Sequence, residues 1–521
     1  MNKKLVLISI SGIQEFISNA KSIRELYAGS TLIKNVILKW YKQIQQLCGE
    51  KNFSMPPQSG NISKEDVPNC IIFTYKSKEE IDNDRLEVEL SEKLRNNMDV
   101  YGLPFYVVCV DYDESKDESY NNAYLELSEK FRAYKNNRLK AYEKVMEKQK
   151  TNSENCTLCG KEKQLESSMN RYCYICEQKV NHPIQGKRPS TSSIASSEWK
   201  YYVEKKQKSE FSRFEEMMKN LGDNEKSEEF YYLDDLKKLT NTNESEKLKM
   251  ELILKDLYKC EKPSNYFALI RMDIDDLGKY LSNTSCDLEE HQVDTFGKMR
   301  QFSQKVNEIL NEVKLYSKEK VSIYSGGDDF LFFLPLDEIV TVLPNIYEKF
   351  HEVWKGTELT YSQSIVIAHR KSPLKNIMQE STKQLHAVKE YYKNDKKGGV
   401  SISLIYRGSS NKICFIKEKN EIEAMTKLLQ LFKEKKITKS LAYSLQEHLK
   451  YIDGEFDDDD YLYEIAINEI RNICHKKSND ESLYFEEVRT LFDQSCTKDK
   501  ICIDKFFEKL HILERLGGEL I

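Results

Sequence analysis

One short stretch, VSIYSGGDDFLFFLP from Val321 to Pro335, constrains the fold of this chain more than any other. Five mostly β-prone residues precede a Gly-Gly-Asp-Asp tip and five apolar residues follow it, a pattern that predicts a tight β-hairpin. Gly326 and Gly327 permit positive φ angles at the tip and let another group approach the backbone closely. The carboxylates of Asp328 and Asp329 repel each other, and nothing else in the hairpin neutralises them. The tip is therefore either a plain surface turn or part of a metal site that needs a further carboxylate.

A second acidic cluster can supply that carboxylate. Tyr266–Met272 is predicted to form a buried strand that runs into the segment DIDDLGK, which begins at Asp273. On a strand, Asp273 and Asp275 point to the same face. Acidic residues at the carboxyl end of a strand, before a glycine-containing turn into a helix, are typical of phosphate sites in α/β sheets. Since Mg²⁺ prefers carboxylates together with substrate phosphates, the two acidic segments together favour a metal-dependent nucleotide site.

The motifs YSGGDDFLFFLP and RMDIDDLGKYL resemble the palm polymerase/cyclase domain of the large subunit of type III CRISPR–Cas effector complexes, closest to its Cmr-type branch. This family is related to nucleotide cyclases and to GGDEF-type diguanylate cyclases. The resemblance implies an α/β multidomain protein with two ferredoxin-like palm domains, a four-cysteine zinc module and helical domains. We expect a first, degenerate palm domain at residues 1–150, a zinc module at 151–182, a helical insert at 183–262, a second palm domain at 263–410 and a C-terminal helical domain at 411–521.

Length and charge agree with several domains and exclude one class of function. A chain of 521 residues is too long for a single core. With 80 Lys+Arg against 85 Asp+Glu, the chain is not a nucleic-acid binder held by bulk charge. Any RNA contact then comes from local patches or from partner subunits. We find no signal peptide and no apolar run near the roughly 18 residues of a membrane span, and we predict a cytoplasmic protein.

Residues 1–150 are predicted to form the first palm domain. Strands are expected at Lys4–Ile10, Cys70–Tyr75 and Phe105–Tyr112, and a helix with one apolar face at Gly12–Tyr27. The runs GIQEFI and RELYAGS resemble the first palm domain of the family, which is usually degenerate and forms half of the nucleotide pocket. This region has no paired strand-end carboxylates. Its polar candidates for nucleotide contact are Ser11, Gln14, Arg24 and Ser30.

Four of the 13 cysteines form two C-x₂-C pairs separated by thirteen residues: Cys156, Cys159, Cys173 and Cys176. Two such pairs can present four thiolates to Zn²⁺ in a tetrahedron, and a site closed by four protein ligands has a structural role. The other nine cysteines are scattered, so the chain shows metal usage in a reducing compartment and not a disulfide framework. The following run RPSTSSIA, from Arg188 to Ala195, also resembles the family.

The second palm domain is expected to continue with helices at His291–Leu315, Leu336–Lys355 and Pro373–Asn394, and with strands at Tyr361–His369 and Val400–Tyr406. In the related GGDEF cyclases, a lysine of the last of these helices meets the outer phosphates of the nucleotide. Lys389 lies where the resemblance puts that lysine. From residue 411 the chain is predicted to be helical, and Asp457–Asp460 is predicted to be a solvated acidic loop because no EF-hand spacing surrounds it.

The motifs and the resemblance predict a nucleotidyltransferase that uses Mg²⁺ (or Mn²⁺) and ATP. The metal would be held by Asp273, the Ile274 carbonyl and Asp328, with Asp329 in support. The ATP phosphates would bind the backbone of Asp276, Leu277 and Gly278 at a helix N-terminus and lie close to Gly326 and Gly327. By resemblance, the products are cyclic oligoadenylates that activate a downstream effector, made when the complex of other subunits and crRNA binds target RNA.

Three alternatives stay open. Some relatives are thought to join AMP to S-adenosylmethionine at the same metal site. A non-catalytic scaffold that organises crRNA and target RNA is a second alternative, and the clustered carboxylates disfavour it. A free-standing diguanylate cyclase is a third, which the cysteine module disfavours. Many family members begin with an HD phosphohydrolase domain, but none of the eight histidines here is followed by Asp, so we expect no DNase activity from this polypeptide.

Overall fold

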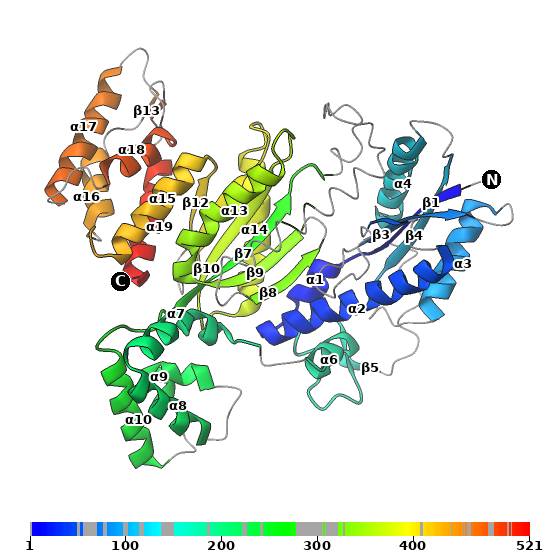
Figure 1. Cartoon of the computed structure of the whole chain (residues 1–521), viewed down its shortest axis with the longest axis horizontal. Coiled ribbons are helices and arrows are strands. Elements are labelled where there is room, and N and C mark those ends of the chain that lie inside the picture. The colour runs from blue at the N-terminus through cyan, green and yellow to red at the C-terminus, as the bar shows by residue number, and fades with distance from the viewer. Residues whose placement is uncertain are drawn as a thin grey trace.

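The computed structural model is a mixed α/β multidomain protein, which confirms the predicted fold class. It describes residues 3–48, 53–55, 70–76, 81–96, 103–113, 119–136, 151–184, 188–220, 227–239, 243–277, 305, 308, 321–326, 329–406, 410–438, 440–450, 452, 454–455, 460–477, 484–496, 500–501 and 503–520. Two sheet domains lie side by side, the N-terminal one at the right of Figure 1 and the other at its centre. One helical unit, which contains α8 to α10, lies below the central domain in Figure 1, and a second one, which contains α15 to α19, lies at the left.

The first palm domain is built on a four-stranded sheet in the order β2-β3-β1-β4, with every described pairing antiparallel. Its strands are β1 (Lys3–Ile10), β2 (Phe53–Met55), β3 (Cys70–Lys76) and β4 (Phe105–Tyr112). Its helices are α1 (Ile13–Ser18), α2 (Ile23–Cys48), α3 (Asn83–Asn96) and α4 (Ser119–Asn136). Alternate apolar residues point to opposite faces of the sheet. Val6 and Ile8 pack toward α1, α2 and α3, while Leu5 and Leu7 pack toward α4.

The predicted single helix over Gly12–Tyr27 is two helices, because the chain turns between α1 and α2. The Ser22 hydroxyl accepts a hydrogen bond from the Glu25 backbone N–H at 3.2 Å, and the Glu25 carboxylate accepts one from the Lys21 N–H at 2.8 Å. This is a near relative of the capping box, which starts a new helix at an S-x-x-E sequence. The apolar face that we predicted is continuous across the turn, and for that reason periodicity alone did not reveal the break.

Along the sequence, a small cysteine module and a helical insert separate the two palm domains. The module contains β5 (Thr151–Asn155), β6 (Lys163–Leu165) and α6 (Tyr174–Asn181). The insert contains α7 (Thr191–Lys206), α8 (Lys208–Asn220), η3 (Ser227–Tyr231), α9 (Leu233–Leu236) and α10 (Glu244–Leu257). It has its own apolar core around Trp199, Phe211 and Phe214. Arg370, at the end of the central sheet, joins the insert through its ion pair with Asp235.

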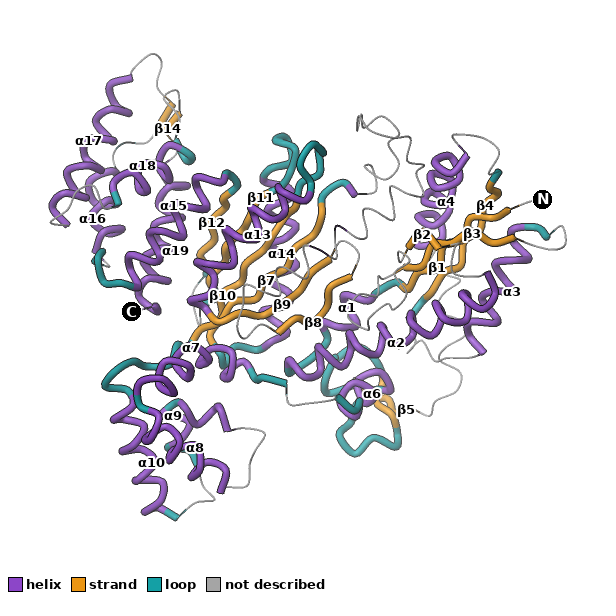
Figure 2. The backbone as a smooth tube through the Cα atoms, in the orientation of Figure 1, coloured by secondary structure: helices purple, strands orange, loops and turns teal. Residues whose placement is uncertain are grey.

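The second palm domain is built on a six-stranded sheet in the order β12-β11-β10-β7-β9-β8. Its strands are β7 (Tyr266–Ile274), β8 (Val321–Gly326), β9 (Asp329–Pro335), β10 (Tyr361–His369), β11 (Gly399–Leu404) and β12 (Lys412–Ile416). Four of them, β8-β9-β7-β10, repeat the order β2-β3-β1-β4 of the first palm domain. β12 extends the sheet beyond the predicted boundary at residue 410. Figure 2 shows this sheet at the centre of the molecule.

Two described helices cover opposite faces of the second sheet. The 3₁₀ turn η4 (Leu336–Glu338) leads into α13 (Ile339–Val353), which packs on the face that carries Ile270. Helix α14 (Leu374–Tyr391) packs on the face that carries Leu269. These helices and the strands β8 to β11 lie where the sequence pattern predicts them, within a few residues. The helix predicted at His291–Leu315 falls outside the described residues, apart from residues 305 and 308.

The C-terminal region is helical, as predicted, and packs on the edge of the second sheet (Figure 1). It contains α15 (Lys419–Lys433), α16 (Ser440–Leu449), α17 (Asp460–Lys477), α18 (Phe485–Asp493) and α19 (Ile503–Leu520), with the short strands β13 (Gly454–Glu455) and β14 (Lys500–Ile501). Helix α19 lies against β12 and α15. Of the predicted acidic loop, Asp460 begins α17 and the three preceding aspartates lie outside the described residues.

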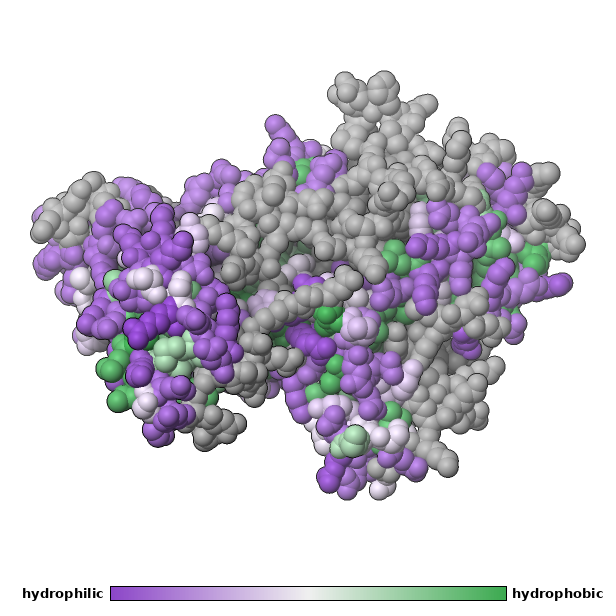
Figure 3. Space-filling model, turned by 60° about the horizontal axis from the view of Figure 1, so that its bottom comes forward, coloured by the Kyte–Doolittle hydropathy of each residue, from purple (hydrophilic) through white to green (hydrophobic). Residues whose placement is uncertain are grey.

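Among the helices of the described chain, none is both long and apolar enough to cross a lipid bilayer. In the view of Figure 3, hydrophilic side chains dominate the described surface, and hydrophobic side chains occur in small separate groups.

Candidate active site and metal centre

The candidate active site lies where β7 ends. Asp273, the second-last residue of β7, is opposite Asp329 on β9 and opposite Ser362 on β10 in the strand register. Gly326, the last residue of β8, is in turn opposite Asp329. The pairing therefore brings the backbone of the hairpin beside the acidic strand end. Gly327 and Asp328 lie outside the described residues, and of Asp329 the structure describes the backbone.

Lys389, from the last turn of α14, reaches this strand end. Its ammonium contacts Oδ2 of Asp273 and lies 3.3 Å from Oδ1 of Asp275. Burial lowers the pKa of Lys389, but the two carboxylates, Asp273 first, outweigh the burial, so the pKa is raised above its ordinary value. Lys389 is therefore protonated at neutral pH. The side chain of Asp273 is 19% exposed, which leaves part of this carboxylate open to solvent.

Asp275 follows the last residue of β7, and its carboxylate is buried. Its backbone N–H donates to the Thr360 carbonyl at 2.8 Å, which extends the pairing of β7 with β10 by one residue. Its Oδ2 accepts hydrogen bonds from Ser362 Oγ at 2.7 Å and from the Gly398 N–H at 3.2 Å. Asp275 and Asp273 thus differ in surroundings, although the strand pattern predicts only that they share a face.

The predicted phosphate-binding residues after β7 are described in part. Asp276 has a positive φ of 52°, and its carboxylate lies 2.9 Å from the Lys397 ammonium. Leu277 is half-buried against the apolar core, and Gly278 lies outside the described residues. We did not predict a role for Lys397. The Gly398-Gly399 pair that follows it marks the turn that brings Lys397 to Asp276, and this pair could have indicated the contact from sequence.

The remaining candidates lie on neighbouring backbone. Ile274 is buried in the apolar core, so only its carbonyl can serve as a ligand. Ser11 is half-buried at the end of β1, where its N–H donates to the Pro104 carbonyl at 2.8 Å, and Gln14 is exposed on α1. These two residues belong to the first palm domain. Helix α1 contacts α14, the helix that carries Lys389.

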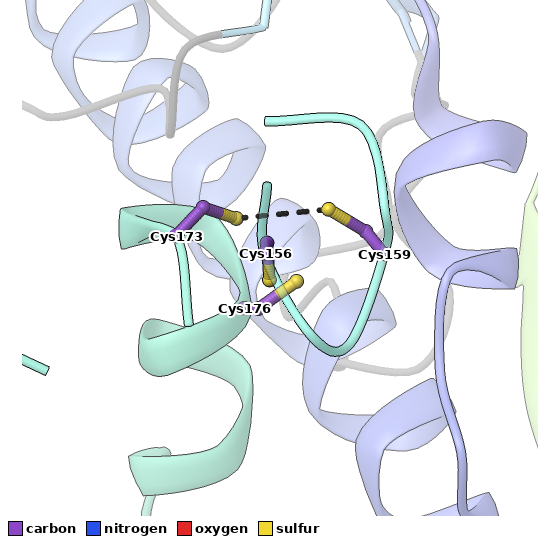
Figure 4. Close-up of side chains that lie close together, drawn as sticks. All are labelled: Cys156, Cys159, Cys173 and Cys176. Atoms are coloured by element: carbon purple, nitrogen blue, oxygen red, sulfur yellow. Dashed lines mark hydrogen bonds between the residues drawn. The ribbon is translucent and has the colours of Figure 1, made fainter. Parts of the chain in front are cut away.

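The four predicted zinc ligands form a compact buried cluster. The sulfurs of Cys156, Cys159, Cys173 and Cys176 all lie within 4.8 Å of one another. The Sγ atoms of Cys159 and Cys173 are 3.9 Å apart (Figure 4). Zn–S bonds of about 2.3 Å in a tetrahedron require sulfurs about 3.8 Å apart, so the cluster fits Zn²⁺.

Backbone turns and shared hydrogen bonds shape this cluster. The first knuckle turns at Gly160, which has a φ of 72° and donates its N–H to the Cys156 carbonyl at 2.9 Å. The second pair begins α6, with Cys173 as its N-cap residue, and a helix N-terminus stabilises negative charge. Hydrogen bonds among the thiols lower the pKa of Cys159 and raise the pKa of Cys173 and Cys176. The donor set and its surroundings therefore suit a soft divalent cation.

The cysteine module is fastened to the first palm domain by a buried lysine. Lys179 of α6 is fully buried, donates to the carbonyls of Phe16 and Asn19 at the end of α1, and lies 4.2 Å above the Phe16 ring. Burial lowers the pKa of Lys179 to about 8. Arg24 of α2 donates to the Val180 carbonyl at 2.8 Å. Sequence reasoning gave Lys179 no role, because a lysine on a short polar helix has no pattern that predicts burial.

Two family models match the chain. One is described as the second palm domain of Cas10/Cmr2 and matches residues 266–397. The other is described as the N-terminal domain of CRISPR-associated protein Cmr2 and matches residues 5–153. The two matched ranges together cover more than half of the 521 residues. The chain belongs to the Cas10/Cmr2 family, the large subunits of type III CRISPR–Cas effector complexes, and this confirms the resemblance inferred from its motifs.

A curated relative and several solved structures agree with this family. The CRISPR system Cmr subunit Cmr2 of Pyrococcus furiosus is 27% identical over 171 residues, which are 28% of this chain and 20% of that protein. The chain thus aligns with about a fifth of the length of this curated relative.

The solved structures share the fold at low sequence identity. A chain of the type III-B Cmr-beta complex in its apo state matches with a TM-score of 0.70 and 14% identity, covering 99% of this chain and 82% of that chain. The same complex bound to cognate target RNA matches with a TM-score of 0.68, 14% identity and coverages of 99% and 83%. A chain of the Csm1–Csm4 cassette in complex with pppApApA matches with a TM-score of 0.52, 11% identity and coverages of 99% and 69%.

Proposed function

We propose that this chain is the catalytic large subunit of a type III CRISPR effector complex and that it joins ATP molecules into cyclic oligoadenylate when the complex binds target RNA. One observation carries the proposal: at the end of β7, Asp273 meets the Lys389 ammonium and lies opposite Asp329 in the strand register. An acidic group beside a cation, at the end of an inner strand of a palm sheet, is suited to a metal-bound triphosphate. The pppApApA-bound Csm1–Csm4 structure, which has this fold, supports the choice of adenylate product.

The donor set fits a hard divalent cation. Mg²⁺ (or Mn²⁺) would be held by Asp273, the Ile274 carbonyl and Asp328, with Asp329 in support, because carboxylate and carbonyl oxygens are the ligands that these ions prefer. When bound, the ion neutralises negative charge at the α-phosphate and lowers the pKa of the attacking 3′-hydroxyl.

The chain supplies the groups that bind and orient the nucleotide. Lys389 donates to phosphate oxygens, and the backbone N–H groups of Asp276, Leu277 and Gly278, with those of Gly326 and Gly327, receive the triphosphate. The 3′-oxygen bonds to the α-phosphorus, the bond from that phosphorus to the pyrophosphate oxygen breaks, and the hydroxyl proton leaves to solvent. Ser11 and Gln14 would contact a second ATP from the first palm domain. Positioning and charge thus provide most of the catalysis.

The proposal includes partners that regulate the reaction in the cytoplasm. Other effector subunits and crRNA would hold target RNA against this chain, and the cyclic product would activate a separate effector protein. The Cmr-beta structure with cognate target RNA, which shares this fold, supports an RNA-bound assembly. The near-balanced charge of the chain is consistent with RNA that is held largely by partner subunits.

The test is the identity of the product. The assembled complex is incubated with labelled ATP, Mg²⁺ and target RNA, and the products are identified by mass spectrometry. We expect cyclic oligoadenylate and pyrophosphate, and their loss in the double variant Asp328→Ala, Asp329→Ala. A conjugate of AMP with added S-adenosylmethionine would redirect the proposal to that acceptor. Unchanged products from the double variant would refute the site assignment. RNA binding with no ATP turnover would leave a scaffold function.

A further inference from the structure

Among the carboxylates of the candidate site whose side chains the structure describes, that of Asp275 is the most completely enclosed. It is 2% exposed, and its partners come from three other segments of the chain. The Ser362 hydroxyl, in β10, donates to Oδ2 at 2.7 Å, and the Thr360 hydroxyl, just before β10, lies 3.4 Å from the same oxygen. The Gly398 N–H, in the turn before β11, donates to the same oxygen at 3.2 Å. The other oxygen, Oδ1, faces the Lys389 ammonium of α14 at 3.3 Å.

This arrangement does not suit a metal ligand. A carboxylate that binds an ion together with substrate needs an oxygen that is open toward the substrate, and both oxygens of Asp275 are directed into protein. Asp273 differs, since its side chain is 19% exposed while that of Asp275 is 1% exposed. The two carboxylates share Lys389, so a buried and a partly exposed acid hold one ammonium between them.

We propose that Asp275 is a positioning residue of the nucleotide site: its buried carboxylate fixes the Lys389 ammonium beside Asp273 and ties the turn before β11 to the end of β7. This inference deepens the proposed function and rests on it. A ligand that engages the open side of Asp273 competes with Lys389 for that carboxylate, and Asp275 then remains as the partner that keeps the ammonium in place. Lys389 can then contact a phosphate while it keeps its ion pair with Asp275.

Asp275 also stabilises the turn before β11. Lys396, Lys397, Gly398 and Gly399 all have positive φ angles, of 53°, 54°, 71° and 139°. Positive φ is strained for Lys396 and Lys397, which carry a Cβ, but not for the two glycines, so the surrounding structure must fix the lysines. The bond from the Gly398 N–H to Asp275 and the bond from Thr360 Oγ1 to the Lys396 carbonyl at 3.2 Å are two of the contacts that do so. Lys397 is in this way presented to Asp276.

The test is a double-mutant cycle in the assembled complex. Asp275→Asn keeps the size of the side chain and an oxygen for Ser362 and Gly398, but removes the charge that faces Lys389. We expect this variant to lower both the affinity for a non-hydrolysable ATP analogue and the rate of product formation by about tenfold or more. In the Lys389→Met background the same substitution should change either quantity by less than about twofold. Asp395→Asn, an exposed carboxylate paired with Lys417 at 2.7 Å, is the matched control and should be neutral.

Other results would overturn the inference. Equal effects of Asp275→Asn with and without Lys389 would show that Asp275 does not act through this lysine. A raised Mg²⁺ requirement with unchanged binding of the analogue in the absence of metal would show that Asp275 is a metal ligand. If Asp275→Asn lowers the melting temperature by more than a few degrees, Ser362→Ala replaces it, since Ser362→Ala removes the shortest bond to Asp275 and keeps the charge. The affinity measurement distinguishes a failed inference from a failed function, because it needs no turnover.

Discussion

The two palm domains have the same backbone pairing at the end of their central strand, but they carry different side chains there. In the second domain, Asp273 lies opposite Asp329 and Ser362. The N–H of Asp275, two residues further, donates to the carbonyl of Thr360, the residue before β10. In the first domain, Ser9 lies opposite Cys70 and Tyr106. The N–H of Ser11, two residues further, donates to the carbonyl of Pro104, the residue before β4. Register and hydrogen bonding therefore make Ser9 the counterpart of Asp273.

The equivalence continues into the turn. Gly12 and Asp276, each three residues beyond the equivalent pair Ser9 and Asp273, both have positive φ angles, of 76° and 52°. The fold is thus specified by the alternation of apolar residues and by this turn, which both domains keep. Two of the acidic residues proposed for the metal site, Asp273 and Asp329, have a serine and a cysteine, Ser9 and Cys70, as their counterparts in the first domain. This difference agrees with the proposal that the second domain holds the metal.

The largest effect should separate Asp273 from its counterpart. Asp273→Ala removes the proposed metal ligand and should slow product formation by about 10³-fold, whereas Ser9→Ala should leave the rate within about twofold. ATP conversion by the RNA-activated complex measures both variants. A comparable loss in the two would mean that both strand ends take part in the chemistry.

Metal removal should affect the first palm domain and not the second. A zinc chelator, or Cys173→Ser with Cys176→Ser, should open the cysteine module and release Lys179 from the end of α1. We expect amide exchange in α1 to accelerate by about tenfold or more, with no change in β10 and β11. Hydrogen–deuterium exchange with mass spectrometry reads both regions in one sample. Uniform acceleration across the chain would contradict a local role for the module.

Two glycine substitutions compare the turns of the two domains. An added Cβ at Gly399 would lie 2.6 Å from the Tyr392 ring, and the φ of 139° is one that other residues rarely adopt. At Gly12 the nearest atom would be 3.6 Å away. We expect Gly399→Ala to lower the free energy of unfolding by about 3 kcal/mol and Gly12→Ala by about 1 kcal/mol. Denaturant titration gives both values, and equal costs would mean that the turn before β11 relaxes.

The last comparison concerns the contacts of the cysteine module. Lys179→Met leaves the carbonyls of Phe16 and Asn19 buried without their donor and should cost about 2 kcal/mol. Lys161, which pairs with Glu15 at the surface, is the control, and Lys161→Met should cost less than about 1 kcal/mol. Thermal unfolding of the two variants is the measurement. A larger loss for Lys161→Met would show that the surface pair, and not the buried lysine, fastens the module.

Much of the fold was predictable because its elements carry local patterns. The strand Tyr361–His369 and the four clustered cysteines were predicted as the structure has them. The break after α1 was missed although Ser22 and Glu25 form a local signature for it. The burial of Asp275 could not be predicted, because its donors lie 87 and 123 residues further along the chain. Sequence identifies a carboxylate, and only distant packing decides whether it is open to a ligand.

The burial of Lys179 has a consequence for biosynthesis. The carbonyl that it satisfies at Phe16 precedes it by 163 residues. At a synthesis rate of about 5–20 residues per second, the ribosome needs roughly 8–33 s to cover that interval. For this time the nascent first palm domain has a helix whose end lacks its donor, and it becomes complete only when the second cysteine pair and Lys179 have left the exit tunnel. The docking of Lys179 would then end the period in which this helix end is exposed to chaperones and proteases.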